Sequence, residues 1–119
     1  MALTRMTLRL YFGDLVFGPG KADLLQAISE EGSISAAGRR MGMSYKRAWS
    51  LVEEMNAAFT EPLVARARGG AHGGGAHLTA AGTAVLADYR ALVARLQRDG
   101  AAEIGAINAR IAADISGGK

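Results

Sequence analysis

The chain has 119 residues, of which half are apolar, and it contains no cysteine. This length provides one modest hydrophobic core, and the absence of thiols excludes disulfide bonds, thiolate metal sites and thiol catalysis. The net charge is +3, and Arg5 and Arg9 interrupt the only apolar run near the start. We therefore expect neither a signal peptide nor a membrane-spanning segment, which favours a cytoplasmic globular protein that binds no membrane.

The first elements are predicted to be β structure followed by a helix. The alternation of apolar residues over 6–12 predicts a strand with these side chains on one face, or a short hairpin that returns over 15–17. Pro19 suits the first turn of a helix, and the apolar residues that follow recur at helical spacing. We expect this helix over 19–30, with its end near Gly32.

Two further helices are expected, separated by a short turn. Ser33 or Ser35 can cap the first helix, and Ser44 can cap the second. Gly42 marks the turn and Gly38 lies where the helices would cross, which is typical of a helix-turn-helix motif. The expected inner faces consist of Ile34, Ala37, Gly38 and Met41 in the first helix and of Ala48, Leu51, Val52 and Met55 in the second.

Between residues 33 and 50 all four charged residues are positive, whereas acidic residues precede and follow this stretch. Such local clustering is expected of a surface that contacts nucleic acid. The N-terminal part of the second helix of the motif enters the major groove, so we expect Lys46 and Arg47 near base edges and phosphates. Ser44, at the helix N-terminus, is suited to a phosphate. Arg39 and Arg40 are either auxiliary phosphate contacts or merely solvated.

A second hairpin is expected after the motif. Residues 63–66 and 76–78 predict two short strands, and the glycine run over 69–75 predicts a long flexible tip. A hairpin in this place is a wing, which would put Arg66 and Arg68 near the DNA backbone or minor groove. The candidate DNA-contacting residues of the motif and the wing are Ser33, Ser35, Arg39, Arg40, Ser44, Tyr45, Lys46, Arg47, Ser50, Arg66 and Arg68.

A long helix capped by Thr79 is expected next, followed after Gly100 by a last helix over 101–115. An apolar stripe on the long helix has the spacing of a coiled-coil seam. The stripe covers the core of the protomer or mediates dimerisation. It consists of Val85, Tyr89, Leu92 and Leu96.

The remaining residues favour neither catalysis nor metal binding. The glycine run lacks the Lys-Ser/Thr ending of a phosphate-binding loop, and His72 and His77 have neither cysteine nor carboxylate neighbours for a metal site. Neither histidine has a serine and an acid at a recognisable catalytic spacing. We therefore expect no enzyme activity, no metal and no cofactor. Trp49 is expected to pack against a neighbouring helix or the wing, and Tyr45 is open between packing and stacking on DNA.

Several motifs resemble the N-terminal DNA-binding domain of the molybdate-responsive regulators of the ModE family. They are GSIS at 32–35, SYK at 44–46 with AW at 48–49, and MN at 55–56. The last is the GGxxGGG run of the wing at 69–75, followed by LT at 78–79 and by Gly82. The resemblance covers about residues 6–98, and LVAR with LTAAG is more distantly similar to LysR-type regulators. It implies a mainly α fold with a small β component, a winged helix-turn-helix over 1–99. The long helix after the wing would mediate dimerisation, which we favour for the apolar stripe. Residues 100–119 lie beyond the resemblance, and we expect them to form a helical extension and tail.

The resemblance also implies a function, namely sequence-specific transcription regulation by a homodimer on a palindromic operator in double-stranded DNA. Proteins of the ModE family carry C-terminal molbindin-type domains that bind molybdate or tungstate, and residues 100–119 are too few to form one. We therefore expect no molybdate binding to this chain alone. The alternative is a winged-helix module for protein interaction or dimerisation that does not read DNA, because a fold alone does not determine a function.

Overall fold

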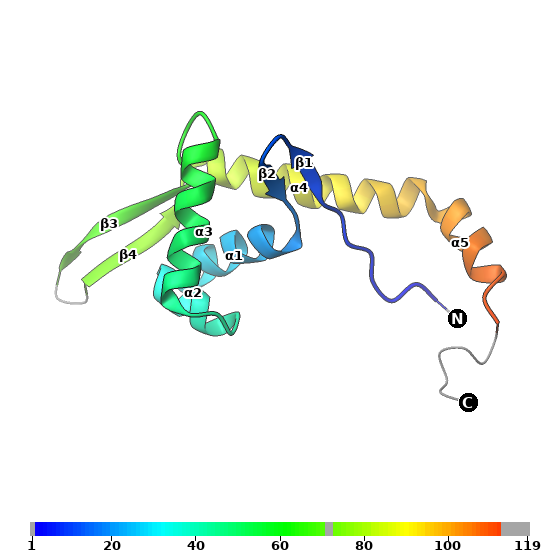
Figure 1. Ribbon diagram of the computed structural model, residues 1–119, viewed down its shortest axis with the longest axis horizontal. Helices are drawn as coiled ribbons and strands as arrows, with labels where there is room; N and C mark the ends of the chain where they lie inside the picture. The colour runs from blue at the N-terminus through cyan, green and yellow to red at the C-terminus, as the bar shows by residue number, and fades with distance from the viewer. Residues whose placement is uncertain (1, 71–72, 113–119) are drawn as a thin grey trace.

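The computed structural model describes residues 2–70 and 73–112 (Figure 1). Helices dominate the fold, and two small antiparallel hairpins accompany them, which confirms the predicted mainly α winged helix-turn-helix. The molecule is elongated because α4 runs away from the other helices. In chain order the elements are β1 (Leu10–Phe12), β2 (Leu15–Phe17), α1 (Pro19–Glu31), α2 (Ile34–Arg40), α3 (Tyr45–Ala58), β3 (Val64–Gly70), β4 (Gly73–Leu78), α4 (Ala80–Asp99) and α5 (Ala101–Ala109).

The N-terminal hairpin is confirmed, but its first strand is shorter than predicted. Leu10 pairs with Phe17 and Phe12 with Leu15, and Gly13 turns the chain with a φ of 60°. The residues before Leu10 form no strand because β2 ends at Phe17, after which the chain enters α1 and offers no further pairing partner. Phe12 lies exposed beside the turn.

The helix-turn-helix forms as its local signals predict. Ser33, rather than Ser35, caps α2 by accepting a hydrogen bond from the Ala36 amide at 2.9 Å. Ser44 caps α3 in the same way, and Gly42 turns the chain between the helices with a φ of 72°. A methyl group on Gly38 would lie 3.0 Å from the Ala48 Cβ, so the small residue at 38 allows the two helices to cross closely.

The predicted wing is present, but the prediction of a long glycine tip was wrong. The strands continue into the glycine run, with Val64 opposite Leu78 and Gly70 opposite Gly73, and an irregularity interrupts the register between Ala67 and Gly70. A glycine keeps its backbone donor and acceptor, so the ladder extends through residues that have no side chain to pack. His72 falls outside the described residues.

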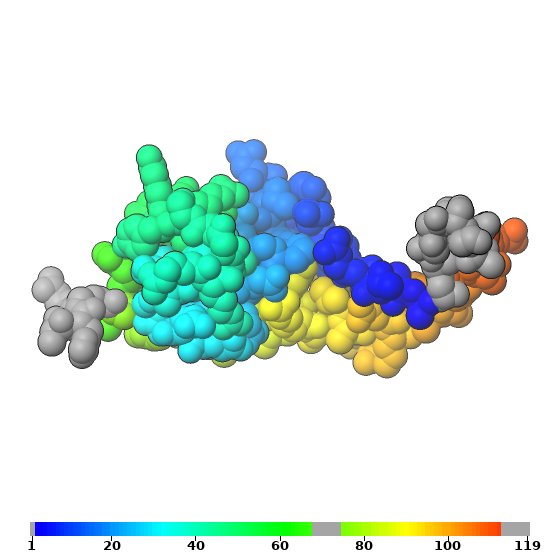
Figure 2. All heavy atoms as spheres, turned by 90° about the horizontal axis from the view of Figure 1, so that it is seen from below, coloured from blue at the N-terminus to red at the C-terminus, as the bar shows by residue number. Residues whose placement is uncertain are grey.

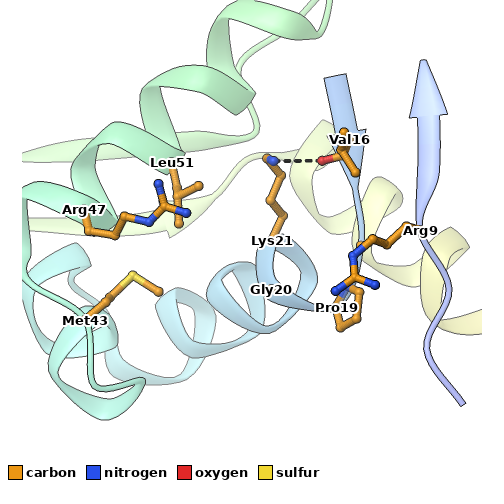
Figure 3. A pocket seen from close by; sticks show the side chains of 9 residues that line it. Arg9, Val16, Pro19, Gly20, Lys21, Met43, Arg47 and Leu51 are labelled. Atoms are coloured by element: carbon orange, nitrogen blue, oxygen red, sulfur yellow. Dashed lines mark hydrogen bonds between the residues drawn. The ribbon is translucent and has the colours of Figure 1, made fainter. Parts of the chain in front are cut away.

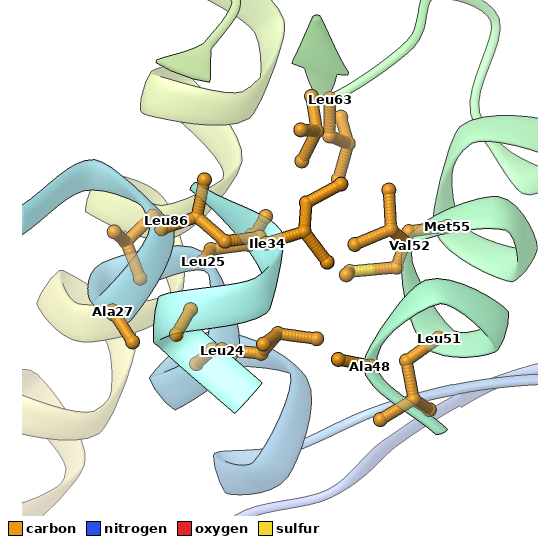
Figure 4. Close-up of a cluster of buried hydrophobic side chains, with 14 of the residues drawn as sticks. Leu24, Leu25, Ala27, Ile34, Ala48, Leu51, Val52, Met55, Leu63 and Leu86 are labelled. Carbon is orange, nitrogen blue, oxygen red and sulfur yellow. The ribbon is translucent and has the colours of Figure 1, made fainter. Parts of the chain in front are cut away.

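The core lies where α1, α2, α3, the base of the wing and the start of α4 meet (Figure 4). Its largest fully buried side chains are Leu24, Leu25, Ile28, Val52, Met55 and Leu63. Gly82 allows α4 to reach this junction, because a methyl group there would overlap the Leu63 carbonyl oxygen. Thr79 begins α4 by accepting the Gly82 amide and donating its hydroxyl to the Pro62 carbonyl at 2.6 Å.

The last helix is shorter than the predicted span of 101–115. The amides of Arg110 and Ile111 bond to carbonyls three residues back, and this tight turn closes α5 after Ala109. Ile111 therefore lies beyond the helix, and Ile115 is outside the described residues. Within the described ranges no helix is both long and apolar enough to cross a membrane.

Candidate nucleic-acid interface

The first turns of α3 place cationic and polar side chains in solvent. The helix is held to the core by one buried face, which contains Ala48, Leu51, Val52 and Met55 as predicted. Lys46, Arg47 and Ser50 are exposed. The same end of the molecule carries α2 and α3 between the wing and the N-terminal hairpin (Figure 2). The arrangement leaves the polar face of α3 open to a large partner.

A compact cluster connects α3 to the wing; we call Tyr45, Trp49 and Arg66 the wing-side cluster. The Arg66 Cζ lies 4.4 Å from the centroid of the Trp49 ring, within the range of a cation–π interaction. The Trp49 ring meets the Tyr45 ring edge-on at 6.3 Å between centroids, and the Trp49 indole N–H donates to the Tyr45 hydroxyl. Packing of Trp49 against the wing is thereby confirmed, while Tyr45 remains 54% exposed.

Polar groups from α2 and the wing converge beside this cluster. Ser33 and Ser35, together with Tyr45 and Arg66, border a hollow of about 120 Å³. The structure therefore brings four of the predicted site residues to one place, although they come from three separate elements. Arg68 lies on β3, but its side chain is outside the described part of the chain.

Arg40 has partners that the sequence analysis did not anticipate. Its guanidinium lies 2.6 Å from a Glu30 oxygen and 3.3 Å from a Glu31 oxygen, so it ties α2 to the end of α1. Hydrogen bonds from Gln26 and Arg40 hold the pKa of Glu30 below its ordinary value, and the hydrogen bond to Glu30 raises the pKa of Arg40. Arg39 donates to the Ser35 hydroxyl at 3.0 Å. The purely positive stretch of sequence is thus partly neutralised in space by the acids that precede it.

Asn56 holds the wing against α3, a role that sequence reasoning missed. Its Oδ1 accepts the Leu63 amide at 2.8 Å and the Val64 amide at 3.1 Å, and its Nδ2 donates to the Val64 carbonyl at 3.0 Å. The Ala76 amide bonds to the Gly32 carbonyl at 2.9 Å, which fastens the other strand to the end of α1. The MN motif was the available signal, because an asparagine near the end of a helix can bond a following backbone segment.

A sequence profile described as bacterial regulatory helix-turn-helix protein, lysR family, matches residues 21–83, just over half of the chain. The chain belongs to this family. The match confirms the predicted class of DNA-binding transcriptional regulator and covers α1 to the first turn of α4. The N-terminal hairpin and most of α4 lie outside it.

Curated relatives of this LysR-family chain carry molybdenum-related names. It is 49% identical over 77 residues to the molybdenum-pterin-binding protein MopB of Rhodobacter capsulatus, covering 65% of this chain and 28% of that protein. It is 49% identical over 69 residues to the molybdenum transport protein ModE of Azotobacter vinelandii, covering 58% and 26%. It is 42% identical over 80 residues to the DNA-binding transcriptional dual regulator ModE of Escherichia coli (strain K12), covering 67% and 30%. The chain thus spans less than a third of these relatives.

A solved structure shares the fold. A chain of the CbnR DBD–DNA complex superposes with a TM-score of 0.57 at 26% identity, and the match covers 74% of this chain and 95% of that one. The neighbour was solved together with DNA. The likeness places the winged helix-turn-helix of this LysR-family chain among DNA-binding domains.

The predicted dimerisation stripe divides into two parts. Tyr89 is only 5% exposed, because it packs in the core of its own protomer and donates its hydroxyl to the Leu8 carbonyl at 2.7 Å. Val85 and Leu92 border an apolar hollow of about 190 Å³ beside the N-terminal hairpin. Leu96 is 42% exposed. Tyr89 therefore serves the fold of the protomer itself.

Proposed function

We propose that this LysR-family chain is the DNA-reading part of a bacterial cytoplasmic transcription regulator, which acts by binding rather than by catalysis. The proposal rests on one observation above all. The first turns of α3 hold Lys46 and Arg47 in solvent while the opposite face of the helix is locked in the core. Such a helix enters the major groove with its N-terminal residues towards the base edges.

The predicted contacts divide by position. Lys46, Arg47 and Ser50 would reach base edges and nearby phosphates from α3, with Ser44 and Tyr45 beside them. Ser33, Ser35 and Arg66 would contact the sugar-phosphate backbone on the wing side, where they border one hollow. Arg39 and Arg40 would contribute less, because Ser35 engages the first and two carboxylates engage the second.

We further propose a homodimer that binds a palindromic operator. Beyond the core, α4 continues with the apolar residues Leu92 and Leu96, and Leu96 is well exposed. A second copy that pairs along this helix would place two recognition helices on half-sites about one helical turn apart. We assign the DNA-binding and dimerisation functions to residues 1–99, with 100–119 as a C-terminal extension.

Molybdate is not proposed as a ligand of this chain. The relatives with molybdenum-related names are matched over less than a third of their length. Calorimetry with molybdate is expected to give no binding heat, and a saturable heat would contradict this proposal.

Selection of bound sequences from random duplex DNA tests the function directly. We expect enrichment of a palindromic site, and loss of that enrichment in the variant Lys46→Ala/Arg47→Ala. The control variant Arg98→Ala/Arg110→Ala removes two positive charges at the far end of the molecule and is expected to retain the enriched sequence. A wild-type chain that shows no affinity for duplex DNA at low salt would instead favour the protein-interaction module.

A further inference from the structure

A cationic hollow borders α3 on the side opposite the wing (Figure 3). Its volume is about 260 Å³, and it lies between α3, the start of α1 and the segment that leads into β1. Arg47 reaches into it from α3, and Arg9 lies on the other side beside Pro19. Lys21 from α1 completes a set of three positive side chains. We call this the α1-side hollow.

The three cations of the α1-side hollow differ in their partners. Lys21 is 13% exposed at its side chain, donates to the Val16 carbonyl at 2.7 Å and lies 3.5 Å from a Glu54 oxygen. In the part of the chain that the structure describes, no carboxylate pairs with Arg9 or Arg47. Like charges around one hollow repel one another, and an anion bound between them removes that repulsion.

The fold places Arg9 rather than leaving it on a loose terminus. The preceding residue, Leu8, accepts a hydrogen bond from the buried Tyr89. A methyl group on Gly18 would lie only 2.9 Å from the Arg9 Cγ, so the aliphatic part of this side chain rests directly on the backbone before α1. The N-terminal segment thus delivers a guanidinium to the flank of α3, although it lies outside the matched helix-turn-helix.

We propose that the α1-side hollow binds a phosphate of the DNA backbone, with Arg9 and Arg47 as its contacts. The inference rests on the proposed function. The major groove is about 12 Å wide and an α-helix with its side chains about 10–12 Å across, so a helix in the groove has a backbone strand along each flank. The wing-side cluster occupies one flank of α3 and the α1-side hollow the other. Guanidinium groups bind phosphate oxygens through paired hydrogen bonds.

The test measures the affinity of Arg9→Ala for the selected operator and for an unrelated duplex over a range of salt concentrations. We expect roughly tenfold weaker binding to both duplexes at low salt, and a salt slope reduced by about one per protomer. Arg5→Ala, which removes the same charge from the same segment, is the matched control and is expected to keep the wild-type slope. Arg9→Lys is expected to retain the slope while losing part of the affinity.

The outcomes separate this inference from the function on which it rests. Suppose that the wild-type chain binds the operator and that the salt slope of Arg9→Ala equals that of the wild type or of Arg5→Ala. Phosphate binding in the α1-side hollow is then refuted, while the proposed function stands. A wild-type chain that binds no duplex overturns both. Inorganic phosphate provides the other source of the same chemistry: saturable phosphate binding that is lost in Arg9→Ala, with an unchanged DNA slope, would reassign the hollow to a free oxyanion. Circular dichroism of each variant confirms that it is folded.

Discussion

The two flanks of α3 are built differently. On the wing side, the side chains of the wing-side cluster contact one another, so each already has a partner within the protein. On the α1 side, Arg9 and Arg47 border an open hollow, and no ion pair among the described residues engages them. These contacts join the wing to α3, and we call this side the wing-side junction, whereas Arg9 and Arg47 on the α1 side are exposed.

This difference has a consequence for substitutions. Changes at the wing-side junction should lower the free energy of unfolding first and DNA affinity second. Changes at the α1-side hollow should lower affinity with little loss of stability, because the removed groups are solvated. Four substitution experiments test this separation, beginning with the largest expected effect on stability.

Gly82→Ala disrupts the contact between the start of α4 and the base of the wing. The added methyl group would overlap the Leu63 carbonyl oxygen, so the start of α4 and the start of the wing have to separate. We expect a loss of about 3 kcal/mol in the free energy of unfolding, because the methyl group meets backbone atoms, which move aside less easily than a flexible side chain. Urea denaturation measures it. Gly105→Ala in α5 is the control, because a methyl group there meets nothing within 4 Å, and it is expected to be neutral or slightly stabilising.

Asn56→Ala removes the bonds that fasten β3 to α3. The amides of Leu63 and Val64 lose their common acceptor at a half-buried position, and we expect a loss of about 1–3 kcal/mol. Asn56→Asp keeps the acceptor for both amides but turns a carboxylate oxygen, in place of the donor, towards the Val64 carbonyl, so its denaturation midpoint should lie below that of the wild type. Equal midpoints for Asn56→Ala and the wild type would show that the wing is held by other contacts.

Tyr89→Phe tests the bond that places Arg9 on the α1 side. Loss of the hydrogen bond to the Leu8 carbonyl should cost about 0.5–1.5 kcal/mol at neutral pH. DNA affinity is expected to fall less than in Arg9→Ala, because the guanidinium is still present but less well positioned. Tyr11→Phe, on the exposed face of the hairpin, is the control and should leave both quantities unchanged.

The same variant has a pH signature. Burial raises the pKa of Tyr89 above its ordinary value of 10.0. The folded protein therefore keeps this proton at pH values at which the unfolded chain has lost it, so the stabilisation is complete below about pH 10 and is lost as the pH rises through the raised pKa. Thermal unfolding between pH 9 and pH 11 should show a shallower decline in Tyr89→Phe than in the wild type. Parallel declines would contradict burial of the hydroxyl.

Local signals explain how much of the fold the sequence predicts. Serine caps, a turn glycine and apolar residues three or four apart are contained within single helices, and α1, α2 and α3 were predicted from them. The wing strands were underestimated because glycine carries no side-chain pattern, whereas strand pairing depends on its backbone groups. The length of the last helix was overestimated because apolar spacing alone does not show at which residue the helical hydrogen bonds end.

The site was predicted only in part, for a related reason. Lys46 and Arg47 follow from their place at the start of the recognition helix, which the sequence reveals. The pairing of Arg40 with acids of α1, and the meeting of Arg9 with Arg47, depend on how separate elements cross in space. In the sequence, Arg9 is recognisable only as an interruption of an apolar run.

The smallest expected effect concerns the wing-side cluster itself. A double-mutant cycle with Trp49→Leu and Arg66→Ala should give a coupling of about 0.5–1 kcal/mol in the free energy of unfolding, the usual size of an exposed cation–π pair. In DNA binding the two variants should differ. Arg66→Ala removes a charge and should reduce the salt slope, whereas Trp49→Leu keeps the charge and should lower affinity at an unchanged slope.

That pattern would show that Arg66 supplies a charge that meets the DNA backbone, whereas Trp49 holds this charge in place. If Trp49→Leu reduced the slope as much as Arg66→Ala, the guanidinium would need the indole ring in order to reach the backbone at all. If neither variant changed the slope, Arg66 would belong to the structural junction alone, and the cations that meet the backbone would lie on α3 and on its α1 side. The wing side would then stabilise the fold, whereas the α1 side would supply positive charge for DNA binding.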